Sequence, residues 1–120
     1  MVGVCFFLSA CATPRNSEKP FNVTLEVDFG PTDRPAMRRM VQVEPGSTPQ
    51  QATAKACSLQ SGAVCCDNRE TAGIDGVMAD PAGNYWWTVS VNGSKKNVSP
   101  FKTRLKPGDV VHWEYRKYDQ

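Results

Sequence analysis

The chain has 120 residues and a mass of 13.2 kDa, which is the length of a single domain. Hydrophobic residues make up 40% and charged residues 22%, a balance typical of a globular rather than a disordered protein. The formal net charge of +2 provides no overall field that would favour nucleic acid or an anionic membrane. A single histidine disfavours most metal and acid–base sites. The longest apolar run is about half as long as a membrane span, which excludes a transmembrane protein.

The first residues have the character of a targeting segment. Met1–Ala10 is apolar and ends in small residues, and Leu8-Ser9-Ala10-Cys11 resembles the lipobox of bacterial lipoproteins. The resemblance implies a signal peptide over residues 1–10, although the usual preceding Lys or Arg is absent. It also implies cleavage before Cys11 and attachment of lipid to that cysteine, which would anchor the protein to a membrane.

The lipobox sets the expected domain organisation and location. Residues 11–20 are polar and contain proline, and they predict a linker between the lipidated cysteine and a folded domain over residues 21–120. We expect an extracytoplasmic lipoprotein of the cell envelope. If the source is Gram-negative, Ala12 resembles the signal for the outer membrane.

Three cysteines remain once Cys5 leaves with the signal and Cys11 carries lipid. In an oxidising envelope, we expect Cys57 to form a disulfide with Cys65 or Cys66, worth about 2–3 kcal/mol. A vicinal Cys65–Cys66 disulfide is the rarer alternative. A zinc site would need these thiols to converge with His112 without any C-x-x-C spacing, so no metal is expected.

The first half of the domain predicts two strands and a helix. Apolar residues alternate with polar ones over Phe21–Phe29, which indicates a half-buried strand, and Met37–Val43 repeats the pattern more weakly. Thr48 suits a helix cap, with Pro49 at the first helical position and Gln51 completing a capping box. The predicted helix continues to about Leu59 and stops at Gly62.

The second half predicts further strands. Between Cys57 and Asp80 the signals are mixed: Ile74–Val77 is the only strand-like piece there, and glycine interrupts it. Tyr85–Val91 alternates strongly and is followed by Asn92 and Gly93, a hairpin-turn dipeptide. A tight turn at Lys106–Asp109 precedes a last strand, Val110–Tyr115. This order predicts an α+β fold, a β-grasp-like roll in which a mixed four- to five-stranded sheet carries one helix on one face.

Two motifs in this half resemble the transcobalamin-like C-terminal domain family. Tyr85–Gly93 matches its W-x-x-x-V-N-G strand, and Leu105–Tyr115 matches its L-x-x-G-D-x-V-x-W-x-Y strand. The match extends over Phe21–Tyr118. It implies a β-grasp domain that, in eukaryotic vitamin carriers, is the smaller of two domains closing over cobalamin. A lone domain covers one face of the corrin, so tight binding would require a partner or a second copy.

The candidate ligand-binding residues are Trp86, Tyr85, Asn92 and His112. Trp86 is expected on the opposite sheet face from Trp87, where an indole can stack on a flat ligand unless loops cover it. His112 is the one possible cobalt ligand, but a lone strand histidine is more often a solvated surface residue. A mildly basic cluster in the loop before the last strand could meet phosphate headgroups or an acidic ligand, although such residues most often only keep a loop solvated; its members are Lys95, Lys96, Lys102, Arg104 and Lys106.

The sequence contains no catalytic constellation. It has no G-x-S-x-G motif, no Walker loop and no recognisable pair of carboxylates, so we expect a protein that is not an enzyme. The leading hypothesis is an envelope-anchored, ligand-binding domain that needs no cofactor, with cobalamin or a related corrinoid as the specific candidate ligand. The alternative is a module that binds another envelope protein through a sheet edge or an aromatic patch.

Overall fold

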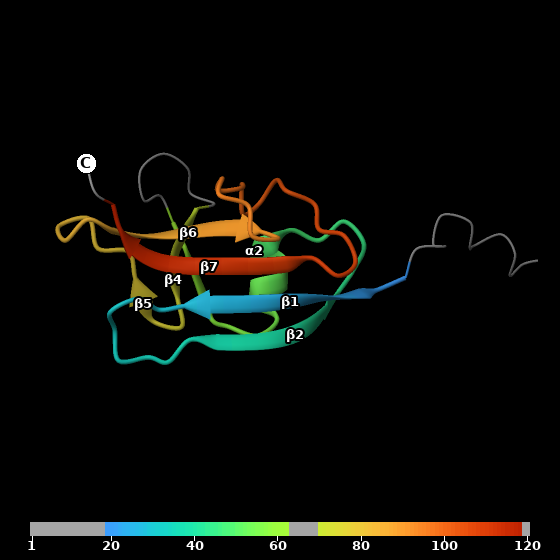
Figure 1. Cartoon of the computed structure of the whole chain (residues 1–120), viewed down its shortest axis with the longest axis horizontal. Helices are drawn as coiled ribbons and strands as arrows, with labels where there is room; N and C mark the ends of the chain where they lie inside the picture. The colour runs from blue at the N-terminus through green and yellow to red at the C-terminus, as the bar shows by residue number, and fades with distance from the viewer. Residues whose placement is uncertain (1–18, 63–69, 119–120) are drawn as a thin grey trace, which may run out of the picture.

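The computed structural model describes residues 19–62 and 70–118, which form two sheets and one short helix (Figure 1). The larger sheet has the strand order β2-β1-β7-β6, and the smaller has the order β3-β4-β5. The strands are β1 (Phe21–Asp28), β2 (Met37–Val43), β3 (Leu59–Ser61), β4 (Thr71–Ile74), β5 (Val77–Met78), β6 (Tyr85–Val91) and β7 (Val110–Lys117), and the helix is α2 (Pro49–Ala54). Within these residues no helix has the length and apolarity of a membrane span.

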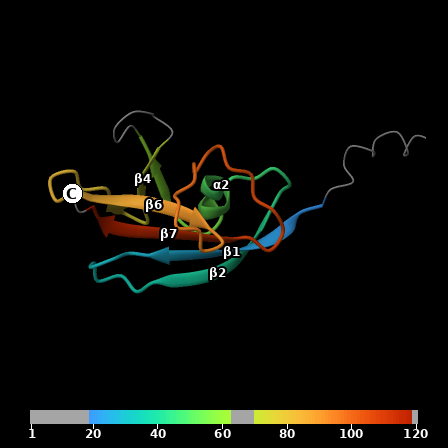
Figure 2. The ribbon, with the colours of Figure 1, turned by 45° about the horizontal axis from the view of Figure 1, so that its top comes forward.

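The larger sheet is mixed. Strands β1 and β7 pair in parallel at its centre, while β2 pairs antiparallel with β1 and β6 antiparallel with β7. The helix α2 packs on one face of this sheet, and the smaller sheet lies beside it, as the turned view shows (Figure 2). The predicted α+β, β-grasp-like roll is therefore confirmed, with the three-stranded sheet as an addition that the sequence did not predict.

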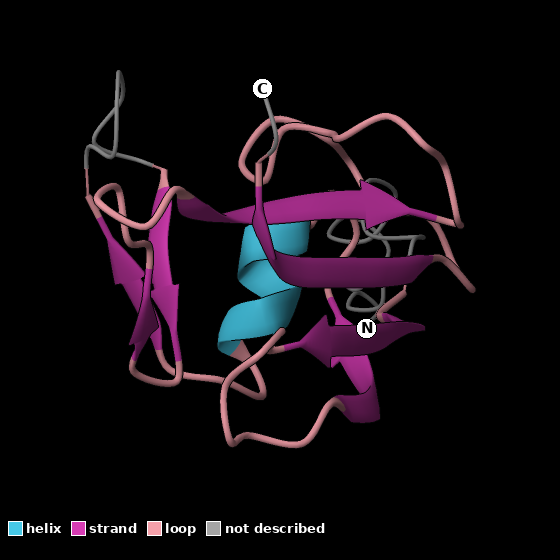
Figure 3. Ribbon diagram, turned by 60° about the vertical axis from the view of Figure 1, so that its left-hand side comes forward, coloured by secondary structure: helices cyan, strands magenta, loops and turns pink. Residues whose placement is uncertain are grey.

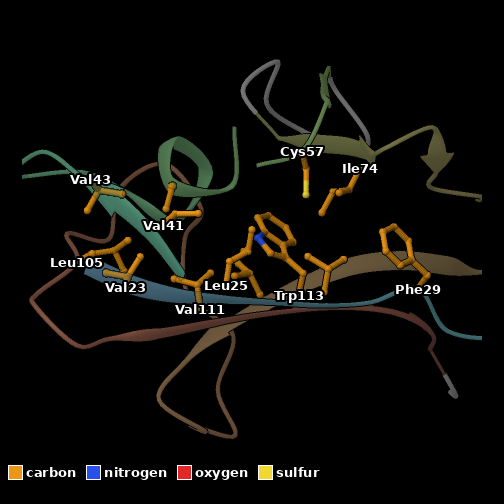
Figure 4. Packing of buried hydrophobic residues seen from close by; sticks show 13 residues of the cluster. Val23, Leu25, Phe29, Val41, Val43, Cys57, Ile74, Leu105, Val111 and Trp113 are labelled. Atoms are coloured by element: carbon orange, nitrogen blue, oxygen red, sulfur yellow. The ribbon is translucent and has the colours of Figure 1, made fainter. Parts of the chain in front are cut away.

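The core lies between the larger sheet and the layer of helix and smaller sheet. Val23, Leu25 and Val27 alternate along β1 and are at most 1% exposed, as period-two patterning predicts. Val111 and Trp113 continue the same face on β7. Figure 4 shows Trp113 pointing toward the layer that carries Cys57 and Ile74. Trp113, predicted to be core, is 1% exposed.

The start of α2 follows the sequence prediction, but its end does not. The backbone N–H of Gln51 donates to Thr48 Oγ1, and the Gln51 side chain accepts from the Thr48 N–H, so the capping box forms. The helix ends at Ala54 rather than near Leu59, because Leu59 starts β3, which pairs with β4. Gly62 does not end the helix. It directly follows β3, and its N–H donates to the carbonyl of Glu70, the residue just before β4, so Gly62 extends the pairing of these two strands.

The segment expected to be one interrupted strand forms a hairpin. Strands β4 and β5 pair antiparallel across Asp75 and Gly76, whose φ angles are 50° and 85°. Two successive residues with positive φ are the geometry of a tight two-residue hairpin turn, which Asp and Gly adopt readily. The sequence signal was therefore a turn between two short strands (Figure 3).

The turn after β6 is present but does not join paired strands directly. Asn92 and Gly93 have φ angles of 58° and 75°, and the Ser94 N–H donates to the Val91 carbonyl. The chain then runs along the outer edge of β6, where the Val98 N–H donates to the Val89 carbonyl at 2.9 Å, before β7 begins. The tight turn predicted at Lys106–Asp109 is confirmed, with the Asp109 carboxylate accepting from the Lys106 N–H at 2.8 Å.

Candidate functional site

A cavity of about 500 Å³ opens along the outer edge of β6, and we call it the β6 pocket. Its walls come from β6 itself, from the start of β4 and from the loop that returns after β6. The volume lies within the range of small-molecule sites. Most of the lining is apolar or aromatic, including Trp86, Trp87, Trp113, Val89, Val98 and Pro100.

Trp86 is held in a fixed orientation at this pocket. Its indole Nε1 donates to Asn84 Oδ1 at 2.7 Å. Asn84 has a positive φ of 63°, and its side-chain amide and backbone carbonyl both bond to the backbone of Tyr118. Because Asn84 is fixed by these bonds, the half-buried indole presents a preorganised ring surface to a ligand.

The other two tryptophans form the floor of the pocket. Trp87 donates from Nε1 to the Val77 carbonyl of β5 at 2.8 Å, and Trp113 donates from Nε1 to Thr53 Oγ1 of α2 at 2.7 Å. Their rings meet edge to face, with centroids 6.4 Å apart. All three indole N–H groups are thus used inside the protein, so a ligand would meet the half-buried Trp86 and Trp87 through their ring surfaces, while Trp113 lies buried behind them.

The backbone of β6 adds hydrogen-bonding groups to the pocket. The residues that flank β6 show its hydrogen-bonding pattern: the Asn92 N–H donates to the Val110 carbonyl of β7, and the Asn84 carbonyl accepts from Tyr118, just after β7. The backbone groups of the even-numbered residues of β6 therefore point toward β7, and those of the odd-numbered residues point outward. Tyr85 exchanges two bonds with Asp80, and the Val89 carbonyl accepts from Val98. Between them, the Trp87 N–H and C=O point outward and pair with none of the residues 19–62 and 70–118.

The electrostatic character of the pocket is nearly neutral. Glu70 is the charged residue among its described lining, and the other polar groups are amides and hydroxyls such as those of Asn97, Thr71 and Tyr118. The Asn97 amide lies 3.5 Å from the Tyr118 hydroxyl. This arrangement suits a flat, mainly uncharged ligand that offers one or two amide-like hydrogen-bonding groups to the edge of β6.

The structure brings one of the four candidate ligand-binding residues to the pocket, namely Trp86. Tyr85 stacks on Tyr115 with ring centroids 5.3 Å apart. The Asn92 side chain bonds to Asp109 and to the Val110 N–H, so it holds the turn. These two residues lie outside the described lining of the pocket.

His112 lies on the face of the larger sheet opposite the helix, which is also the face of Trp86, because Ser90 pairs with His112 and Trp86 with Arg116. Its Nδ1 is 3.0 Å from Glu26 Oε1, and the other oxygen of that carboxylate pairs with Arg38 at 2.9 Å. The three residues form a row across β2, β1 and β7. His112 is not among the residues that line the β6 pocket, although it shares a sheet face with Trp86.

Cys57 is the one cysteine within the described residues, where it is a buried free thiol 3.7 Å from Met37 Sδ. Burial, reinforced by nearby Asp75, raises the pKa of this thiol to about 11. The other predicted partners of a disulfide, Cys65 and Cys66, lie outside the described residues, as do Cys5, Cys11 and the lipobox. The disulfide and the lipid anchor stay predictions. In the described part of the chain, no three His, Cys, Asp or Glu side chains gather as a metal site.

Comparisons with known proteins agree with this fold. Residues 71–117 match the model of a family described as a domain of unknown function, DUF4430. No curated protein sequence matches the chain.

Two solved structures resemble the whole domain. Haptocorrin in complex with Cbi superposes with a TM-score of 0.65 at 14% identity, over 86% of this chain and 26% of haptocorrin. A protein from Ruminococcus gnavus ATCC 29149 that has been suggested to bind metal superposes with a TM-score of 0.64 at 17% identity, over 82% of this chain and 99% of that protein. The chain thus spans about a quarter of the length of haptocorrin. It has the fold of a domain of that protein, and its carboxyl-terminal strands carry the sequence pattern of the DUF4430 family.

Proposed function

We propose that this protein is a non-catalytic binding domain of the bacterial cell envelope that holds a flat, mainly uncharged small molecule in the β6 pocket. The observation that supports the proposal best is that one apolar cavity holds both a fixed indole, Trp86, and the Trp87 backbone edge, which none of the described residues pairs with. The ring surface would stack on the ligand, and the backbone N–H and C=O would fix its orientation. The lipid anchor at Cys11 would place the domain outside the cytoplasm.

A corrinoid is the specific ligand that we propose. It is a flat macrocycle with carboxamide side chains, so it offers both a stacking surface and groups that can bond to a strand edge. The resemblance of residues 21–118 to the transcobalamin-like family and the fold shared with haptocorrin support this choice. A single domain provides one wall, so we expect weaker binding than a two-domain carrier would give, unless a partner or a second copy covers the other face.

A thermal-shift titration against cobalamin, cobinamide, haem and a panel of sugars tests the proposal. A ligand at about a hundred times its dissociation constant adds about 2.7 kcal/mol of stability, which corresponds to several degrees in a domain of this size. We expect a corrinoid to raise the melting temperature, Trp86→Ala to abolish the rise, and His112→Ala to preserve it. A flat response to the whole panel would contradict small-molecule binding by this domain alone.

A second candidate function is recognition of an envelope protein, and the free edge of β2 favours it. Odd-numbered residues of β1 bond to β2, so Arg38, Met40 and Gln42 direct their backbone groups outward at the other end of the sheet. Met40 is also 66% exposed, the highest value among the large hydrophobic side chains described. An extended segment of a partner could add a strand here.

Proline at position 40 separates the two functions. Because the Met40 N–H points away from β1, Met40→Pro removes a donor from the edge without removing a bond within the sheet. If a partner adds a strand, co-purification with that envelope protein is lost in Met40→Pro and retained in Trp86→Ala. The opposite pattern would assign recognition to the pocket.

A further inference from the structure

Six basic side chains are exposed at one end of the molecule, and we call this group the basic end. One precedes β1 and five lie in the loop between β6 and β7: Lys19, Lys95, Lys96, Lys102, Arg104 and Lys106. That loop, residues 92–109, holds five basic residues and one acidic residue, a charge of +4. Because the whole chain carries +2, the rest of the chain carries −2. The positive charge of the chain is therefore concentrated in this loop.

None of these six cations pairs with a carboxylate in residues 19–62 and 70–118. The one acidic residue of the loop, Asp109, already accepts from the Asn92 amide and from a backbone N–H. Elsewhere three arginines do lie near carboxylates: Arg34, Arg38 and Arg116 are 3.8, 2.9 and 4.0 Å from them. Among the residues that the structure describes, no carboxylate therefore compensates the positive charge of the basic end.

The amino-terminal segment joins the domain at the same end. The Gly108 N–H donates to the Asn22 carbonyl, and the Thr24 N–H donates to the Asp109 carbonyl. A shallow groove is lined by Lys19 and Phe21 on one side and by Leu105, Lys106 and Pro107 on the other. Figures 1 and 2 both show the start of β1 beside the loop that leads into β7.

The expected anchor would bring this end close to a membrane. Lys19 is eight residues after Cys11, a stretch that spans at most about 26–29 Å when fully extended. Lysines attract an anionic bilayer once they lie within about a Debye length, 8–10 Å, of its surface. A linker of this length allows that approach.

We propose that the basic end docks on anionic lipid headgroups and so sets the orientation of the domain on the membrane surface. This inference relies on the proposed anchor for the location of the domain, but the affinity for headgroups belongs to the folded domain itself. The phosphate groups would be bound by charge rather than by an enclosed site, so the contact would weaken as salt increases. Asn97, Val98 and Pro100 belong to the same loop and line the β6 pocket, so the docked surface would border the ligand site.

Vesicle co-sedimentation of the full chain carrying Cys11→Ser, which cannot be acylated at that position, tests the docking. One set of vesicles contains equal parts of phosphatidylcholine and phosphatidylglycerol, and the other contains phosphatidylcholine alone. We expect binding to the anionic vesicles to be at least about tenfold stronger, and to be lost when salt is raised from roughly 0.1 M to roughly 0.5 M. Equal binding to both sets, or binding to neither, would overturn the proposal.

Two triple variants with the same change in net charge provide the control. Lys95→Gln/Lys96→Gln/Lys102→Gln should weaken binding about tenfold or more, whereas Lys55→Gln/Arg116→Gln/Lys117→Gln, away from the basic end, should change it by less than about threefold. Equal losses would show attraction by net charge alone and would overturn a specific docking end.

Competition with inorganic phosphate at constant ionic strength distinguishes headgroups from a free anion. Phosphate should leave vesicle binding unchanged, and displacement of the protein from the vesicles would instead indicate a site for a free anion. Acylation of wild-type Cys11 is read separately by mass spectrometry, and pocket binding by ligand titration, so failure of docking is distinguishable from failure of the proposed function.

Discussion

The indole of Trp113 donates a hydrogen bond from Nε1 to Thr53 Oγ1 at 2.7 Å, and the same hydroxyl donates to the Pro49 carbonyl at 2.7 Å. Trp113 is 1% exposed and Thr53 is fully buried. The two bonds join the central strand β7 to the first turn of α2 through the middle of the core. Because Trp113 also forms part of the pocket floor, this contact couples the position of the helix to the shape of the candidate site.

Replacing Thr53 by valine should destabilise the protein by about 1–3 kcal/mol. The change keeps the side-chain volume but leaves the buried indole N–H without an acceptor. Urea denaturation monitored by tryptophan fluorescence measures the free energy of unfolding. Thr53→Ser, which retains the hydroxyl and loses a methyl group, should cost less than the valine variant, and a greater loss in serine would contradict the role of this bond.

The helix cap should also be measurable. A helix of six residues does not form in isolation, so α2 depends on its cap and on packing against the sheet. Thr48→Ala removes the acceptor for the Gln51 N–H and should cost about 0.5–2 kcal/mol of stability, whereas Thr48→Ser should retain most of it. If chemical denaturation shows the same unfolding free energy for alanine as for wild type, the capping box is not stabilising.

Period-two patterning and local capping signals predicted much of the fold. The alternation over Phe21–Phe29, Tyr85–Val91 and Val110–Tyr115 corresponds to β1, β6 and β7, and Thr48 starts the helix where its chemistry requires. These signals are local, since each depends on residues a few positions apart. Strands β3 and β5 have three and two residues, too few for periodicity to appear, so the smaller sheet was missed and the helix was extended into β3.

The candidate site was predictable only in part because it is built from distant segments. Alternation placed Trp86 opposite Trp87, and Trp86 does line the pocket. The return of the chain along β6, which brings Val98 and Pro100 to the site, has no local signature in the sequence. The positive φ of Asn84, whose side chain accepts the hydrogen bond from the Trp86 indole, also has no local signature in the sequence.

Asn84→Gly should weaken ligand binding in the β6 pocket while leaving the fold intact. Glycine tolerates the φ of 63°, but it removes the acceptor that orients the Trp86 indole. We expect an affinity loss of about three- to tenfold, from an interaction worth about 1 kcal/mol, measured by ligand titration of tryptophan fluorescence.

Asn84→Ala provides the matched comparison for that variant. Alanine removes the same side-chain bonds and in addition strains the backbone at positive φ, so it should unfold at a lower urea concentration than Asn84→Gly. Both variants should lose affinity to a similar extent. If Asn84→Gly binds the ligand as tightly as wild type, the orientation of Trp86 does not contribute to binding.

The raised pKa of the Cys57 thiol should make the free energy of unfolding of the reduced protein depend on pH in the alkaline range. Burial raises the pKa of its thiol from 9.0 to about 11, so between these values the folded protein keeps a proton that the unfolded chain has released. Stability is therefore complete below about pH 9 and falls as the pH rises toward about 11, by about 2–3 kcal/mol in total. Urea denaturation with a reductant present, at about pH 8 and about pH 10.5, measures this loss.

The Cys57→Ala variant is the necessary control, because burial also raises the pKa of the Tyr115 hydroxyl. This variant retains the contribution of Tyr115 and should lose less stability between the two pH values than wild type does. A disulfide from Cys57 to Cys65 or Cys66 would remove the thiol titration when the reductant is omitted. An equal loss of stability in wild type and Cys57→Ala would mean that Cys57 ionises as readily in the folded state as in the unfolded chain.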